Sequence, residues 1–136
     1  MEGVRRLERN AALRVLIVED ESLIAMDHEQ AVTDAGYTVL GLAWDTASAL
    51  DAARAAKPDV VLMDMDLKDG PTGNTIAPVL HRDYGVKPIF ITGNLDMVTP
   101  EARALSLALL PKPVSLYSLK IVLDAAARVI VEIHLA

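Results

Sequence analysis

The sequence predicts a doubly wound α/β fold, with a parallel five-stranded sheet in the order 2-1-3-4-5. Short, wholly apolar runs recur along the chain, as expected of strands that are covered on both faces. Segments with helical spacing of apolar residues separate these runs, so that strands and helices alternate. Hydrophobic residues make up 52% of the 136 residues and aromatic residues only 4%, which indicates one domain with an aliphatic core.

The first half of the chain is expected to supply three strands and two helices. The strands are expected over 13–18, 37–43 and 60–63. The first helix is expected over 21–35, because apolar residues recur there at helical spacing and Gly36 ends the pattern. An alanine-rich helix follows, which starts at a cap supplied by Asp45 or Thr46 and runs to about Ala56.

The second half is expected to add two strands and three helices. The strands are expected over 88–91 and 107–110, and the loop LKDGPTGN follows the third strand. The next helix is expected to start at Asn74 or Thr75, which keeps Pro78 in its first turn, where a missing N–H is tolerated. Thr99 and Ser115 are expected to cap the last two helices.

The composition limits which molecules the protein can bind and where in the cell it is expected. The net charge of −6 argues against a nucleic-acid-binding surface, because contacts to phosphates need clustered Lys and Arg. No cysteine is present, so neither disulfides nor thiol chemistry is available. We expect residues 1–12 to form a charged leader that can fray and residues 13–136 to form the domain. No signal peptide or membrane span is evident, so we expect a soluble cytoplasmic protein.

Five polar side chains lie at the ends of the predicted strands. They are Glu19, Asp20, Asp64, Thr92 and Lys112. Ligand sites in such sheets lie at the carboxyl ends of the strands, where the strand order reverses, so these side chains are expected to converge. Crowded carboxylates repel one another, and burying them is costly unless a cation relieves the charge. Hard carboxylate oxygens suit Mg²⁺, so the pattern predicts a magnesium site for phosphoryl chemistry.

Four motifs in a fixed order carry a family resemblance. They are the acidic pair in LIVED, PDVVLMDMDL followed by DG, PIFITG, and PKP. The chain resembles the receiver domain of two-component response regulators from about residue 13 to 127, which implies a flavodoxin-like (βα)₅ fold. The resemblance implies that Asp64 is the phosphoacceptor and that Thr92 and Lys112 hold phosphoryl oxygens. Asp20 is then a direct Mg²⁺ ligand.

The same resemblance implies further ligands, partners and an output. Glu19 would be an outer or water-mediated Mg²⁺ ligand, and the backbone carbonyl of Asp66 would complete the set of protein ligands. A sensor histidine kinase or histidine phosphotransferase would supply the phosphoryl group. The expected protein is a single-domain phosphorelay switch that changes its contacts with a downstream protein. It is not an enzyme beyond its own phosphorylation and dephosphorylation.

The chain departs from the family at several positions near the fourth and fifth predicted strands. Leu109 stands where the family usually has the aromatic residue that swings inward, and Gly93-Asn94 follows Thr92. These traits resemble a subgroup with a Thr-Gly strand end and no aromatic switch, so we expect segment 93–98 and the helix after it to become ordered on phosphorylation instead. The side chain of Asp66 borders the phosphoryl group in this family and either tunes autodephosphorylation or is a solvated loop acid.

Two other functions compete with a receiver. Asp64 and Asp66 also resemble the first motif of haloacid-dehalogenase-type phosphatases, where one aspartate is the nucleophile and the other the acid/base. A receiver-like module that is never phosphorylated and only binds partners is the second alternative.

The last helix carries an apolar stripe for the sheet, which runs from Leu116 to Ile133, and a second apolar set beyond it, which favours a homodimer over a monomer. His28 is expected to be solvated, and Met26 and Met97 are expected in or near the core.

Overall fold

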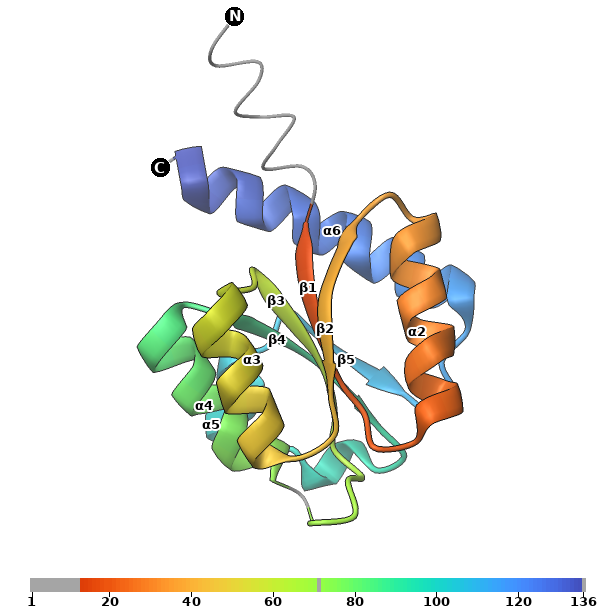
Figure 1. The fold of residues 1–136 in the computed structure, drawn as a ribbon, viewed down its shortest axis with the longest axis vertical. Coiled ribbons are helices and arrows are strands. Elements are labelled where there is room, and N and C mark those ends of the chain that lie inside the picture. Colours follow the sequence, from red (N-terminus) through yellow and green to blue (C-terminus); the bar gives the residue numbers. More distant parts are fainter. Residues whose placement is uncertain (1–12, 71, 136) are drawn as a thin grey trace, which may run out of the picture.

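The computed structural model describes residues 13–70 and 72–135 and shows one parallel sheet with helices on both faces (Figure 1). The five strands in this part of the chain are β1 (Arg14–Val18), β2 (Thr38–Ala43), β3 (Val60–Asp64), β4 (Lys87–Thr92) and β5 (Ala108–Pro111). They lie in the order β2-β1-β3-β4-β5, and every neighbouring pair is parallel. The predicted doubly wound fold is confirmed.

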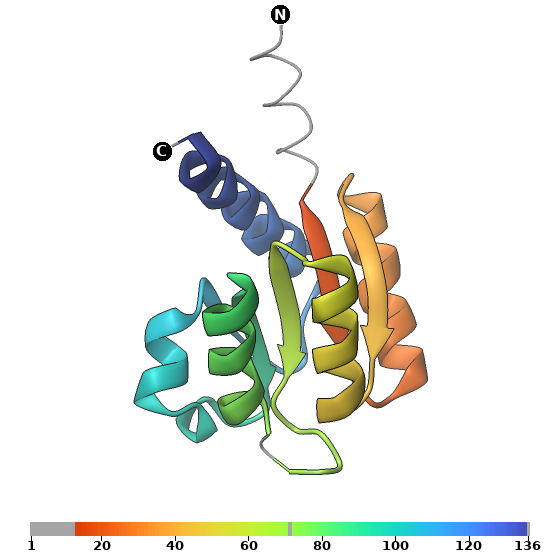
Figure 2. The ribbon, with the colours of Figure 1, turned by 60° about the vertical axis from the view of Figure 1, so that its left-hand side comes forward.

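Five α-helices and one short 3₁₀ helix lie between the strands or after the last one within the described residues. They are α2 (Ser22–Asp34), α3 (Thr46–Ala56), α4 (Gly73–Tyr84), η1 (Leu95–Met97), α5 (Pro100–Leu105) and α6 (Leu116–Leu135). Helices α2 and α6 cover one face of the sheet, and α3, α4 and α5 cover the other (Figure 1, Figure 2). Because both faces are covered, β3 is buried along its whole length.

The core consists of two apolar clusters, one on each face of the sheet. Side chains alternate along a strand, so Leu16 and Val18 of β1 join one cluster while Val15 and Ile17 join the other. Phe90, the only phenylalanine, is fully buried between β4 and the α3–α5 layer. Aliphatic side chains fill most of the remaining interior, as the composition predicted.

The expected helix caps are present, and the open choice at α3 is resolved. Asp45 is the cap of α3, because its carboxylate accepts the Ser48 N–H at 2.9 Å and the Ser48 hydroxyl accepts the Asp45 N–H in return. The Thr99 hydroxyl caps α5 through the Ala102 N–H, and the Ser115 hydroxyl accepts the N–H of Ser118 at the start of α6.

Helix α4 starts earlier than the sequence predicted. It begins at Gly73, so Pro78 is the sixth residue and not part of the first turn. The ring of Pro78 therefore removes one interior hydrogen bond of α4. The early start depends on Gly73, because a Cβ there would lie 2.5 Å from the sulfur of the buried Met65. Glycine thus allows α4 to approach the residue that follows Asp64.

Three predictions about side-chain exposure need correction. The apolar stripe of α6 is buried at Leu119, Leu123, Ala126 and Ile130, but its two ends, Leu116 and Ile133, are exposed. His28 was expected to be solvated and is buried in α2. Met26 and Met97 were expected in or near the core and are exposed, because they face outward beyond the two apolar clusters.

The predicted leader, residues 1–12, lies outside the described residues. In the part of the chain that is described, no helix has the length and apolar character needed to cross a membrane.

Candidate functional site

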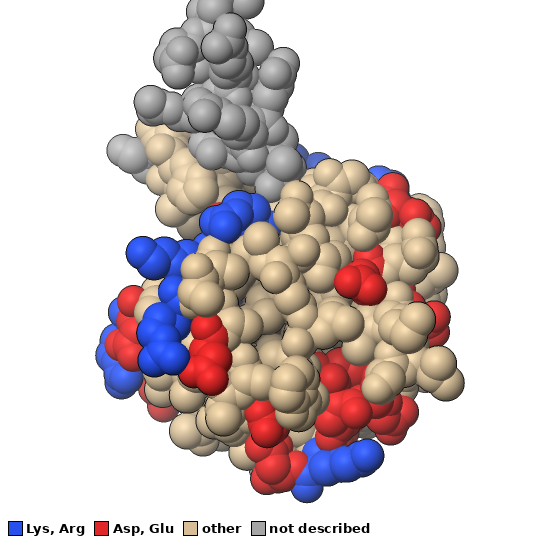
Figure 3. Space-filling model, viewed as in Figure 1, with Lys and Arg blue, Asp and Glu red and all other residues tan. Residues whose placement is uncertain are grey.

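The carboxyl ends of β1 and β3 bring three acidic side chains together. Glu19 and Asp20 follow β1, Asp64 ends β3, and the two strands are direct neighbours in the sheet. One carboxylate oxygen from each of the three lies within 4.8 Å of the others. Acidic side chains gather at the corresponding end of the molecule, the lower end in Figure 3. The convergence that the strand ends predicted is therefore present.

Glu19 carries the clearest sign that this cluster lacks positive charge. It is only 3% exposed, its Oε2 accepts the Glu21 N–H at 3.1 Å, and its Oε1 has no partner among the described residues. Burial, together with the nearby Asp64 carboxylate, raises the pKa of Glu19 to about 7. A buried carboxylate oxygen without a donor is costly, so this corner of the site favours a cation.

Asp20 lies at the more open side of the cluster. Its Oδ2 accepts the backbone N–H of Lys68 at 2.6 Å, which ties the β1–α2 turn to the loop after β3. Three carboxylate oxygens, two from buried residues and one from a half-buried residue, suit Mg²⁺ as ligands, since this ion takes few protein ligands and keeps several waters. These three oxygens and the unpartnered Oε1 of Glu19 therefore fit a divalent cation.

Asp64 lies between this cluster and a lysine. The Nζ of Lys112 is 2.9 Å from Asp64 Oδ1, and the same oxygen accepts the Asp66 N–H at 2.8 Å. Burial acts to lower the pKa of Lys112, but the carboxylates of Asp64 and Asp66 raise it above its ordinary value. Lys112 is therefore a fixed cation beside a carboxylate that is only 3% exposed. The Lys112–Pro113 peptide bond is cis.

The side chain of Asp66 is anchored by donors around Asp64. Its Oδ2 accepts the Gly93 N–H at 2.9 Å and lies 3.2 Å from Lys112 Nζ, while its Oδ1 is 3.3 Å from the Thr92 hydroxyl. Partial burial acts to raise the pKa of Asp66, but these donors hold it below its usual value. Asp66 is thus more than a solvated loop acid.

The loop after β4 is held by hydrogen bonds at several points. The buried Thr92 hydroxyl accepts the Asn94 N–H at 3.0 Å. Asn74 at the start of α4 donates to the Met97 carbonyl at 2.8 Å and accepts the Thr99 N–H at 3.0 Å. These contacts connect the residues beside Asp64 to α4 and α5.

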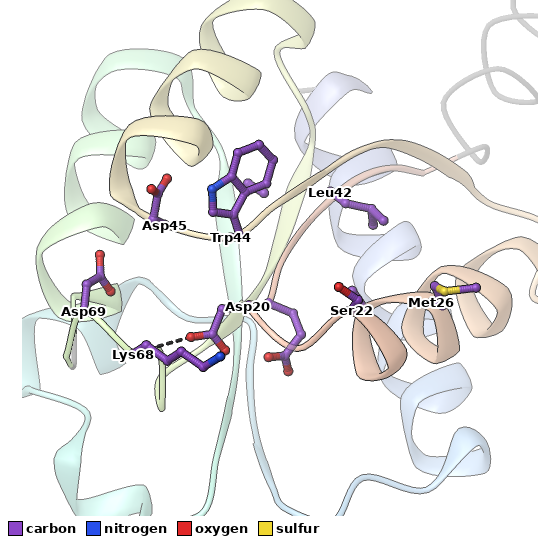
Figure 4. A pocket seen from close by; sticks show the side chains of 11 residues that line it. Asp20, Ser22, Met26, Leu42, Trp44, Asp45, Lys68 and Asp69 are labelled. Atoms are coloured by element: carbon purple, nitrogen blue, oxygen red, sulfur yellow. Dashed lines mark hydrogen bonds between the residues drawn. The ribbon is translucent and has the colours of Figure 1, made fainter.

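A groove of about 710 Å³ opens beside Asp20 (Figure 4). Met26, Leu42 and Trp44 supply its apolar side, and Trp44 is 61% exposed. Trp44 is the only tryptophan of the chain, and it lines the same groove as Asp20. Its fluorescence is therefore a natural probe of events at the acidic cluster.

All five strand-end residues lie at one edge of the sheet, but not in one cluster. Glu19 and Asp20 lie on one side of Asp64, and Thr92 and Lys112 contact Asp66 on the other. Sequence reasoning missed the N–H of Gly93, the backbone N–H of Lys68 and the bridging side chain of Asn74. The glycine directly after Thr92 was visible in the sequence, whereas the two loop contacts had no signal there.

Comparison with known proteins identifies the family. A model described as the response regulator receiver domain matches residues 15–124. The chain belongs to this family. It is 35% identical over 113 residues to the phyllosphere-induced regulator PhyR of Methylorubrum extorquens, which covers 82% of this chain and 42% of that protein. The transcriptional regulatory protein PdtaR of Mycobacterium tuberculosis is 35% identical over 112 residues, with coverage of 78% and 52%.

A solved structure supports the same assignment for this receiver. The crystal structure of the response regulator PhyR from Brucella abortus matches with a TM-score of 0.77 and 31% identity, over 93% of this chain and 53% of that one. The chain spans about half the length of the curated relatives it matches. Receiver domains are signalling modules, generally not enzymes, and bind Mg²⁺ at an acidic pocket. The family match therefore disfavours the haloacid-dehalogenase alternative.

Proposed function

We propose that this receiver accepts a phosphoryl group on Asp64 and uses it to switch contacts with other proteins. The donor is the phosphohistidine of a sensor histidine kinase or a histidine phosphotransferase. The observation that carries the proposal is the position of Asp64, a buried carboxylate with an acidic cluster on one side and Lys112 at 2.9 Å on the other. The cytoplasm stays the predicted location.

The transfer needs little from the protein beyond position and charge. An oxygen of the Asp64 carboxylate bonds to phosphorus as the P–N bond to the donor imidazole breaks. The bonding electron pair stays on the imidazole nitrogen, which takes up a proton. Because the transition state is loose, neutralisation of the phosphoryl oxygens does most of the catalysis. Lys112 supplies a cation, and the Thr92 hydroxyl and the Gly93 N–H lie beside it as further donors.

We also propose that Mg²⁺ binds at the acidic cluster. Asp20 and Asp64 are the direct carboxylate ligands, the backbone carbonyl of Asp66 is a third, and Glu19 acts in the outer shell. The unpartnered Glu19 Oε1 and the three converging oxygens support this assignment. When bound, the ion supplies positive charge to the phosphoryl oxygens and offsets the repulsion among the carboxylates.

A labelling experiment separates the receiver from its alternatives. The protein is incubated with Mg²⁺ and a small phosphodonor, and covalent label is followed on the wild type, Asp64→Asn and Asp66→Asn. A receiver gives label that Asp64→Asn abolishes and Asp66→Asn retains. Rapid turnover of many phosphomonoesters would support a phosphatase, and the absence of label on the folded wild type would support a module that only binds partners.

Helix α6 offers a surface for a homodimer. Ile121, Ala125 and Val129 follow one another at a spacing of four and are exposed, and they border a groove next to β5 that Leu107 and Ala108 also line. Such an uncharged stripe beside an edge strand supports pairing of two copies through α6. Sedimentation over a concentration series tests this, with and without beryllofluoride. Only monomer under both conditions would exclude the dimer.

A further inference from the structure

The carboxylate of Asp66 contacts hydrogen-bond donors that lie next to Asp64. Three groups contact its carboxylate: the Gly93 N–H at 2.9 Å, Lys112 Nζ at 3.2 Å and the Thr92 hydroxyl at 3.3 Å. Asp66 lies two residues after Asp64, and its own N–H donates to Asp64 Oδ1. An anion that is not the phosphoacceptor therefore holds an amide and an ammonium donor next to the phosphoacceptor. It also lies within reach of the Thr92 hydroxyl, whose nearer acceptor is the Asn94 carbonyl at 3.1 Å.

A phosphoryl group on Asp64 needs the same kind of donors. It adds anionic oxygens beside Lys112, which lies 2.9 Å from Asp64 Oδ1. Charge-assisted hydrogen bonds to such oxygens are among the strongest in proteins. Two anions that share one lysine repel each other, and each N–H or O–H proton is best given to one acceptor. The phosphoryl group and the Asp66 carboxylate are thus alternatives for one set of donors.

We propose that Asp66 is a resident anion that occupies the phosphoryl-binding donors and must be displaced before phosphorylation. This inference rests on the proposed phosphorylation of Asp64. The Asp66 side chain is 34% exposed, so a rotation about its own side-chain bonds can carry the carboxylate into solvent. A Cβ at Gly93 would lie 3.6 Å from Asp66 Oδ2, an ordinary van der Waals distance, so Gly93 acts here through its N–H and not through the space it leaves.

The same contact gives the loop after β4 an anchor of its own. Asp66 holds the Gly93 N–H, and Thr92, Asn94 and Asn74 continue the hydrogen-bonded path through this loop. When a phosphoryl group displaces the Asp66 carboxylate, the Gly93 N–H donates to a phosphoryl oxygen and no longer to Asp66, so it keeps an anionic acceptor. Ordering of segment 93–98 should therefore be modest in the wild type and large only when the Asp66 carboxylate is absent.

Beryllofluoride, an acyl phosphate mimic, tests the competition directly. Its affinity is measured at saturating Mg²⁺ by NMR of the Gly93 amide, on the wild type, Asp66→Ala, Asp66→Asn and Asp96→Ala. Asp96 is the matched control, because it is an exposed acid of the same loop and no described residue donates to its carboxylate. We expect Asp66→Ala to bind about tenfold more tightly than the wild type, Asp66→Asn to be intermediate and Asp96→Ala to be unchanged.

A second readout follows the contact between Asp66 and the Gly93 N–H itself. Without beryllofluoride, the Gly93 amide of Asp66→Ala should exchange its hydrogen about tenfold faster than in the wild type, and beryllofluoride should restore protection. Equal affinity in wild type and Asp66→Ala, or equal Gly93 exchange, would overturn the inference and leave the phosphoacceptor intact. If neither protein bound beryllofluoride, the proposed function would fail together with the inference.

Discussion

Asp64 separates two unlike halves of the site. The metal half, Glu19 and Asp20, consists of carboxylates alone and leaves Glu19 Oε1 without a partner among the described residues. The donor half, formed by Asp66, Thr92, Gly93 and Lys112, already holds an anion, because the donors contact the Asp66 carboxylate. The first half lacks a charge of opposite sign, whereas the second is internally satisfied.

This difference in charge determines how each half responds to an added ion. Buried carboxylates without a cation destabilise the fold, so binding a cation to the metal half stabilises the protein. Binding an anion to the donor half instead replaces contacts that are already made, so its net gain is smaller. Phosphorylation therefore depends on a cation that the site favours and on an anion that has to displace Asp66.

The largest effect is expected from Lys112, because its ammonium group contacts the carboxylates of both Asp64 and Asp66. Lys112→Ala removes the cation that lies 2.9 Å from Asp64 and 3.2 Å from Asp66. Beryllofluoride affinity should fall by about 100-fold or more, as expected for loss of a charged donor to an oxyanion. Mg²⁺ affinity, followed by Trp44 fluorescence, should rise, because a repelling positive charge is gone. Loss of both affinities in a folded variant would contradict the division into two halves.

An effect of intermediate size is expected on the pH dependence of folding stability, which tests the metal half through Glu19. Burial raises the pKa of Glu19 from its ordinary value of 4.5 to about 7, so the folded state holds this proton more tightly than the unfolded chain. The stabilising effect of that proton is fully present below about 4.5 and is lost as the pH rises to about 7. Without Mg²⁺, Glu19→Gln should match the wild type at low pH and exceed its stability near pH 7.5, by on the order of 2 kcal/mol.

Urea unfolding with a chelator at both pH values measures this difference, and Asp34→Asn is the exposed control. Saturating Mg²⁺ should remove the advantage of Glu19→Gln, because the cation compensates the wild-type carboxylate. An advantage of the variant that persisted with Mg²⁺ would place Glu19 outside the metal half.

The smallest effect is expected outside both halves. The Tyr37 hydroxyl donates to Asp124 of α6, which also pairs with Lys120 at 2.8 Å. Tyr37→Phe should cost about 1 kcal/mol of stability, as for one hydrogen bond, and leave Mg²⁺ and beryllofluoride affinities unchanged. Thermal unfolding and the two titrations measure this. A change in either affinity would mean that α6 is coupled to the site.

Much of the fold was readable from the sequence. Apolar or β-rich runs predicted every strand to within one residue at each end. The apolar signal was clearest in β1, β3 and β4, because a strand covered on both faces has almost no polar positions. Asp64, Lys112 and the acidic pair were found because parallel strands deliver their ends to one edge. The start of α4 was missed, because it depends on the space that Gly73 leaves for Met65, a contact between segments that no local pattern encodes.

The donor half was predicted less completely than the metal half. Asp66 was left open between two roles, and the structure shows its carboxylate on Gly93, Thr92 and Lys112. These contacts join the ends of three different strands, so only the folded chain defines them. His28 was misjudged for a related reason, because its burial comes from packing of α2 and not from its neighbours in the sequence.

A magnesium titration followed by Trp44 fluorescence tests the division of the site most directly. It is run on the wild type, Asp20→Asn and Asp66→Ala, where the last two each remove one acidic charge next to Asp64. We predict that Asp20→Asn lowers Mg²⁺ affinity at least about tenfold, whereas Asp66→Ala, which keeps the backbone carbonyl, changes it less than about threefold. Equal losses in the two variants would contradict the account, because the carboxylates would then form one undivided acidic site.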